Sequence, residues 1–159
     1  MQTLNHYTEL LNYIKGLAEK DPLVNVVTQG YFDDIDLDKM TLYPLVHIQI
    51  NSGGFTNGQT VRFNVTLGAL TDRDSNNEEI GSKEFLSNTN EEDNYNEMFA
   101  VLNRIWTVMY QDFEDADITA SADPDVEKVS DDYANGLDGW LITFDVEMPN
   151  NVMSLCQYL

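Results

Sequence analysis

Acidic residues are unevenly distributed along this chain, and their distribution limits the folds that it can adopt. The 159 residues carry 28 acidic and 8 basic side chains, a formal net charge of −20. Of the acidic residues, 22 lie in three segments, 33–38, 72–93 and 112–138. The intervening segments carry the periodic apolar patterns of core-forming elements, which disordered acidic tails lack. We therefore expect a folded domain whose charge lies in loops and on the outer surface.

Length and composition are those of one globular domain, spanning residues 1–159. A chain of this size is expected to bury about 70% of the surface that it exposes when unfolded. Cys156 is the only cysteine, so an internal disulfide is excluded. The sequence begins without the basic leader and apolar core of a signal peptide, and no apolar run approaches the roughly 18 residues of a membrane helix. We expect a cytosolic product that does not enter a membrane.

Two segments have the apolar spacing of amphipathic helices. Residues 3–20 form the first, with Thr3 as its expected N-cap and Asp21-Pro22 as its end, because a residue before proline is disfavoured in the α region. Residues 94–113 form the second, with a wide apolar face about 30 Å long.

Alternating apolar residues predict the strands of an antiparallel sheet. Residues 45–50 and 61–69 form the clearest pair. The turn residues 51–54, with Asn57-Gly58 close behind them, are expected to join the two strands as a hairpin.

The third clear strand is 139–148, which alternates in the same way and ends at Pro149. Weaker strand candidates lie at 24–29, 118–122 and 126–129, and residues 136–139 are expected to form a turn. The order of these elements predicts an α+β fold, with an antiparallel sheet covered on one face by the two long helices. A long acidic loop, 71–93, and a tail, 149–159, complete the chain.

The apolar faces of these elements define a predicted core. Its members are Leu11, Ile14, Val46, Ile48, Phe63, Val65, Leu102, Ile105, Trp106, Ile142, Phe144 and Val146.

The long acidic loop is the predicted interface. A structureless segment of this length inside a compact domain is usually functional or disordered, so we expect it to be mobile in the isolated subunit and ordered by a neighbouring chain. The interface candidates are Asp72, Asp74, Glu78, Glu79, Ile80, Glu84, Phe85, Leu86, Glu91, Glu92 and Asp93. Among them the apolar residues are the expected anchors.

Catalytic and cofactor motifs are missing from the sequence. His6 and His47 are the only histidines, and neither has a nucleophile beside it that would suggest a triad. Cys156 has no local motif that would lower its pKa. No dinucleotide, P-loop or zinc-binding spacing occurs. We expect no enzyme activity, no catalytic residue and no cofactor.

Two acidic runs have part of the spacing of a calcium loop. In the run Asp72, Asp74 and Asn76, the sixth position is Asn77 and the twelfth is Lys83, so the glycine and the glutamate are missing.

The other run fails in the same way. Asp34, Asp36 and Asp38 occupy the first, third and fifth positions of the loop. The sixth position is Lys39 instead of glycine, and the twelfth is Leu45 instead of glutamate, so the sharp turn and the bidentate ligand are both missing. A solvated acidic loop is the favoured interpretation, and no metal site is predicted.

The order of elements resembles the tail terminators, or tail-completion neck proteins, of tailed bacteriophages. The resemblance is carried by the helix at 3–20, the strand pair at 45–50 and 61–67, the helix at 94–113 and the closing strand at 139–146. It covers most of the chain and rests on pattern, since the family has no catalytic motif.

The resemblance implies a structural virion protein, assembled in the host cytoplasm. Such a protein forms a homo-oligomeric ring, usually hexameric, on the last ring of the tail tube and presents a docking surface to head-completion or neck proteins. DNA passes through the ring without being bound specifically. A wall of carboxylates would repel phosphate there, although acidity can equally serve solubility.

Two other interpretations remain open. An acidic module that mimics DNA and occupies a basic protein groove would suit the net charge of −20. Another neck or baseplate component would have a similar size. A DNA-binding face is disfavoured, because eight scattered Lys and Arg side chains cannot neutralise a stretch of phosphates.

Overall fold

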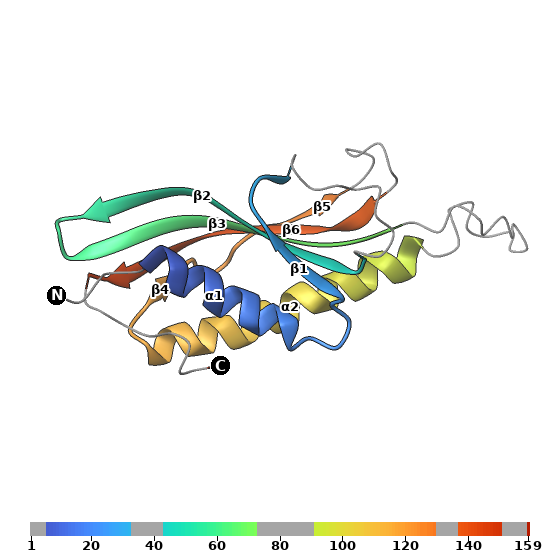
Figure 1. Cartoon of the computed structure of the whole chain (residues 1–159), viewed down its shortest axis with the longest axis horizontal. Coiled ribbons are helices and arrows are strands. Elements are labelled where there is room, and N and C mark those ends of the chain that lie inside the picture. The colour runs from blue at the N-terminus through green and yellow to red at the C-terminus, as the bar shows by residue number, and fades with distance from the viewer. Residues whose placement is uncertain (1–5, 33–42, 73–90, 130–136, 151–158) are drawn as a thin grey trace, which may run out of the picture.

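The protein is a mixed six-stranded sheet with two helices (Figure 1). The computed structural model describes residues 6–32, 43–72, 91–129, 137–150 and 159. The elements are α1 (His6–Glu19), β1 (Val26–Gln29), β2 (Leu45–Thr56), β3 (Thr60–Asp72), α2 (Glu91–Asp115), β4 (Thr119–Ala120), β5 (Val126–Val129) and β6 (Leu137–Pro149). The predicted α+β fold is confirmed.

The sheet has the strand order β1-β2-β3-β6-β4, and β5 also pairs with β6. All neighbours are antiparallel except β1 and β2, which run parallel. The expectation of a purely antiparallel sheet is therefore corrected at this one pair. A parallel pair needs a connection that returns the chain to the same end of the sheet, and residues 30–44 are long enough to provide it.

The hairpin turns later than the sequence predicts. Residues 51–54 are part of β2, and the turn lies at Asn57-Gly58, whose φ angles are 52° and 66°. Positive φ at two successive positions is the conformation that Asn-Gly adopts at low cost, so this pair takes the turn. The extended run through Gly53 and Gly54 lengthens β2 to 12 residues.

Two other predicted boundaries are wrong. Asp72 ends β3 and α2 begins at Glu91, so both ends of the expected loop 71–93 are regular structure. Acidic residues suit the first turn of a helix because its N-terminal N–H groups carry positive partial charge. At the expected turn 136–139, Leu137 to Gly139 are inside β6. A Cβ on Gly139 would lie 2.1 Å from the Ala69 carbonyl oxygen, so close strand approach explains this glycine.

Both helices pack on one face of the sheet and form the main core with it (Figure 1). Of the predicted core, nine residues are buried, whereas Leu11, Phe63 and Trp106 are only half-buried. The buried face of α1 is rotated from the prediction: Leu10 and Tyr13 are fully buried, while Tyr7 is 49% exposed. A smaller core contains Tyr43, Leu45, Leu70, Val129 and Leu137.

Polar contacts join the two helices across the main core. The Tyr13 hydroxyl donates to the Asp112 carboxylate, and burial together with this bond raises the pKa of Tyr13. Arg104 on α2 donates two hydrogen bonds, of 2.7 and 2.9 Å, to Asp21 just beyond α1. Burial raises the pKa of the Asp21 carboxyl, but hydrogen bonds from Arg104 and the Leu23 N–H outweigh it and leave that pKa below its usual range.

Candidate assembly surface

The two long edges of the sheet differ in how their backbone is covered. Along β6, β4 pairs opposite Val146 and Glu147, and β5 pairs with residues 139–142. Between them, the Ser121 N–H donates to the Asp145 carbonyl and the Asp145 N–H donates to the Ser121 hydroxyl. The outer side of β6 is therefore bonded along most of its length.

The β2 edge is covered only at its start. β1 pairs with residues 45–48 of β2, and the Gly30 N–H donates to the Ile48 carbonyl. Within the described part of the chain, no strand pairs with the outer side of β2 from Ile50 to Thr56. We call this stretch the open edge. We call residues 50–64, which include it, the arm; its hairpin extends beyond the ends of both helices (Figure 1).

Strand register shows which backbone groups the open edge presents. Ile48 directs its carbonyl toward β1, and alternate residues of a strand face the same neighbour. A bulge at Asn51 shifts the register by one residue, so Ser52 lies opposite Asn64 and Gly53 opposite Phe63. Ile50, Gly53 and Phe55 therefore turn their N–H and C=O groups away from β3, in the geometry that accepts another strand.

A network of side-chain hydrogen bonds holds the bulge on the outer face of the sheet. The Asn51 amide donates to Asn64 (2.7 Å) and to Thr66 (2.8 Å), and accepts from Gln49 (2.7 Å). Asn64 in turn donates to Asp145 on β6 (2.9 Å). These bonds tie β2, β3 and β6 together at the base of the arm, where the helices do not cover that face.

The helix-side face of the arm carries exposed aromatic surface. Phe55 is 81% exposed, and Phe63 packs edge-on against Tyr7 of α1 with ring centroids 6.1 Å apart. A hollow of about 420 Å³ opens beside them. It is lined by His6, Tyr7, Gly53, Gly54, Phe55, Val61, Phe63 and Asn150.

The arm differs from the rest of the protein in charge. No acidic residue occurs between Asp38 and Asp72, although the chain contains 28 in total. Arg62 is exposed and is the only charged residue of the arm. Glu147 and Asp145 of β6 lie opposite Arg62 and Asn64, so the acid-free part of the arm's surface is its β2 side. Two copies of a protein with net charge −20 repel each other, and this repulsion is smallest where one copy presents such a surface.

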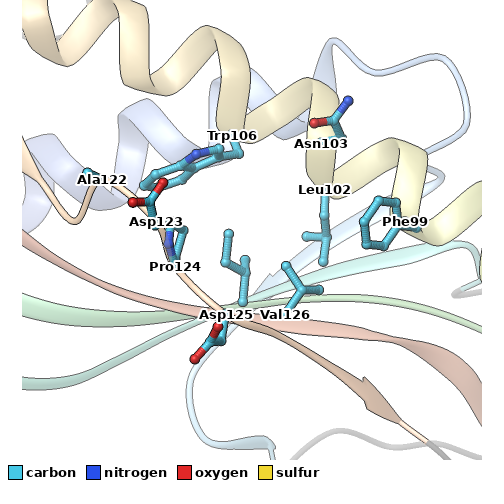
Figure 2. A pocket seen from close by; sticks show the side chains of 10 residues that line it. Phe99, Leu102, Asn103, Trp106, Ala122, Asp123, Pro124, Asp125 and Val126 are labelled. Carbon is cyan, nitrogen blue, oxygen red and sulfur yellow. The ribbon is translucent and has the colours of Figure 1, made fainter.

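A pocket of about 350 Å³ lies near the opposite edge of the sheet, between α2 and the segment that joins β4 to β5 (Figure 2). It is lined by Phe99, Leu102, Asn103, Trp106, Ala122, Asp123, Pro124, Asp125, Val126 and Ile142. Figure 2 shows Asp123 rising toward Trp106, whereas Asp125 points away from α2. Seven of its ten lining residues are apolar, and the other three are Asn103, Asp123 and Asp125.

The predicted interface residues are only partly within the described chain. Asp72 is the last residue of β3, and Glu91, Glu92 and Asp93 form the first turn of α2. The remaining candidates lie outside the described residues: Asp74, Glu78, Glu79, Ile80, Glu84, Phe85 and Leu86. The N-cap expected at Thr3 and the tail residue Cys156 also lie outside them.

His47 is the most enclosed titratable group near the open edge. Its side chain is 1% exposed, its Nε2 donates to the Gly30 carbonyl (2.9 Å), and its Nδ1 accepts from the Thr28 hydroxyl (2.7 Å). Burial lowers the pKa of His47, partly offset by the bond to Gly30. These contacts join β1 to β2 and hold a buried imidazole between them, which explains His47 as a structural residue.

Neither a metal centre nor a membrane span is found in the described residues. No three His, Cys, Asp or Glu side chains of that part of the chain are placed to share a metal ion. Neither described helix combines the length and the apolarity needed to cross a membrane.

Comparisons with known proteins add no family. No protein-family model matches the sequence, and no curated protein matches it. The resemblance to tail terminators therefore rests on the order of elements along the sequence and stays a prediction.

Sequence reasoning missed the arm and the pocket. The acid-free stretch between Asp38 and Asp72 was a readable signal, since 28 acidic residues in 159 make a gap of this length unusual. The pocket had no such signal, because its residues come from α2, β6 and the segment 122–126, which are separate in sequence.

Proposed function

We propose that this protein is a structural component of a phage tail, resembling a tail terminator whose copies form a ring at the end of the tail tube. The observation that carries the proposal is the open edge, an acid-free strand edge on an otherwise strongly acidic subunit. Natural proteins usually protect long exposed edges with lysine, proline or a covering element. A β-bulge also protects an edge, and this edge has one at Asn51. Past the bulge, residues 52–56 contain no lysine or proline and have no described covering strand, which suits addition of another chain.

The arrangement of the two edges supports a ring. The open edge and the covered β6 edge lie on opposite sides of one sheet. A surface on one side that binds a different surface on the other side of the next copy is a heterologous contact, and heterologous contacts generate rings when the rotation closes. The homo-oligomer that we propose is of this type, with a hexamer as the expected size.

The acidity has a role in this proposal. The arm contributes no acidic residue to a joint, so most carboxylates of each copy remain available to line a central passage. Carboxylates repel phosphate and release no counterions, so DNA would cross such a ring without adhering to it. The tail tube and a head-completion or neck protein are the proposed partners on the two sides of the ring.

Salt dependence provides the test. The oligomer fraction should be measured by size exclusion with light scattering, with purified tail tubes added in a second series. Screening shortens the reach of repulsion from about 30 Å at 0.01 M salt to about 8 Å at physiological ionic strength. We therefore expect ring formation and tube binding to strengthen as salt rises through this range.

The opposite result would contradict the proposal. An acidic DNA mimic binds its basic partner through charge attraction, so its complex weakens with added salt and the protein alone stays a monomer or dimer. A subunit that remains monomeric at every salt concentration and does not bind tail tubes is not a tail terminator.

A further inference from the structure

We infer that Phe55 of one copy inserts into the Trp106 pocket of the next copy, and that this contact is the joint of the ring. The Trp106 pocket is the 350 Å³ pocket between α2 and residues 122–126. The inference rests on the proposed function for the existence of a ring, and it adds which residues make the contact and in which direction.

Phe55 has the properties of an anchor. Its 81% exposure is the highest among the exposed large apolar residues of the described chain. Its backbone is on the open edge, at a position that directs N–H and C=O outward. Aromatic anchors that fill a pocket contribute most of the energy at many interfaces.

The pocket suits an aromatic side chain. An apolar cavity of about 150 Å³ is enough to bind benzene, and this one is about 350 Å³. Trp106 and Phe99 line it, and Phe99 is 47% exposed at its mouth. Edge-to-face packing against these rings would add to the area buried by Phe55.

Both partners lie in the same layer of the molecule. Phe55 is opposite Val61, on the face where Phe63 contacts Tyr7 of α1, so its side chain is on the helix side of the sheet. The pocket is also on the helix side, between α2 and the sheet (Figure 2). Two copies placed edge to edge therefore bring Phe55 and the pocket to the same side.

Charges on the other side of the sheet are complementary. Arg62 alternates with Val61 and Phe63, so it points away from the helices, and its guanidinium lies across Gly54. Asp125 also points away from α2 (Figure 2). When Phe55 of one copy is in the pocket of the next, Arg62 of the first copy and the exposed Asp125 of the second therefore lie on the same side of the sheet.

The two halves of the joint lie at different levels along β6. Phe55 and Val61 are level with Met148, whereas the pocket is level with Ile142. Six residues of strand correspond to about 20 Å. Neighbouring copies are therefore staggered along their strands, and a closed ring requires strands inclined to its axis, as in a barrel.

Two matched pairs of variants test the joint. Phe55→Ala removes the anchor, and Tyr31→Ala, at a 68% exposed aromatic, is its control. Val126→Trp fills the pocket, and Val108→Trp, at a 42% exposed valine of α2, is its control. Circular dichroism and thermal melting verify folding, and Ala122→Trp at the exposed rim replaces Val126→Trp if that variant does not fold.

We expect Phe55→Ala and Val126→Trp each to weaken subunit association by at least about tenfold, as loss of an interface anchor does, and the controls to assemble normally. A 1:1 mixture of the two variants should then form a dimer and nothing larger. The Phe55→Ala copy still has an open pocket and the Val126→Trp copy still has its Phe55, so one joint forms and propagation stops.

The outcomes separate the two proposals. If the wild-type protein forms rings and both Phe55→Ala and the pocket-filling variant form them equally well, the joint is overturned and the proposed function stands. Two variants that fail to associate even when mixed would also overturn the joint, because the mixture keeps one intact Phe55 and one open pocket. A wild-type protein that never associates, with or without tail tubes, overturns both.

Discussion

The two edges of the sheet present the same kinds of backbone groups, but they differ in how many of these groups are hydrogen-bonded to a neighbouring element. The β6 edge is bonded by β4, Ser121 and β5, two of which are strands of only 2 and 4 residues. The β2 edge is covered by β1 over four residues, and no strand of the described chain pairs with its outer side from Ile50 to Thr56. Very short elements are therefore sufficient to cover a sheet edge in this protein. The open edge is a localised feature that the fold could have closed at small cost, and this favours a role for it in assembly.

Charge separates the same two regions. The covered edge runs beside Asp123, Asp125 and Glu127, whereas the arm has no acidic residue. Opposite surfaces of one subunit thus have different electrostatic character, which favours head-to-tail over like-to-like association.

The largest predicted effect compares two phenylalanines, one in the body and one on the arm. Phe144 is 2% exposed and packs against Trp106, so Phe144→Ala should lower the free energy of unfolding by about 3–5 kcal/mol. Phe55→Ala, at 81% exposure, should change it by no more than about 0.5 kcal/mol in low-salt monomer. Urea unfolding of both variants measures this. A loss below 1 kcal/mol for Phe144→Ala would show that the helix-side face is assigned incorrectly.

A second prediction concerns His47, where β1 covers β2. The pKa of His47 is lower in the folded protein than in the unfolded chain. At a pH between these two pKa values, the unfolded state therefore binds more protons than the folded state. The resulting stability is complete above about pH 6.5 and is lost as the pH falls toward the folded pKa, by at most about 1.4 kcal/mol per pH unit.

His47→Gln removes this titration while keeping hydrogen-bonding groups at the site. Chemical unfolding at a series of pH values should therefore show a smaller drop below pH 6.5 for His47→Gln than for wild type. Equal drops would mean that β1 docking does not depend on a neutral imidazole. The carboxyl of Asp21, whose pKa is lowered, contributes in a separate window below its ordinary value.

The smallest predicted effect is that of one added charge. Gln59→Glu places an acid at the exposed turn of the arm, and Gln111→Glu places one on the exposed surface of α2. Because the first adds repulsion where we propose that copies meet, it should weaken association severalfold at low salt, and the second should change it less. Sedimentation at matched ionic strength measures both. Equal effects would indicate that only net charge matters.

Much of the body could be predicted from periodicity. In β6, the alternation through Ile142, Phe144 and Val146 determines which face is buried, because successive strand residues point to opposite sides. The amphipathic spacing of α2 also worked, because residues three and four apart lie on the same face of a helix. In α1 it worked less well, since apolar residues on two adjoining stripes left the choice between Leu10 and Leu11 to packing against β2.

Local turn signals were less reliable than periodicity. Gly53-Gly54 is compatible with a turn and with an extended strand, and pairing with Phe63 and Arg62 selects the strand. Gly139 likewise reads as a turn residue, but the approach of the Ala69 carbonyl requires glycine inside β6. Glycine permits many conformations, so its tertiary neighbours decide which one it adopts.

The sequence by itself determined an α+β domain with two amphipathic helices, three clear strands and charge concentrated in particular segments. Tertiary structure alone decided that β2 continues past the end of β1, and that α2 and residues 122–126 enclose a pocket. The physical reason is that periodicity reports which side of an element is buried. Edge coverage and cavities depend on how far one element extends past another, and no local pattern of side chains encodes that length.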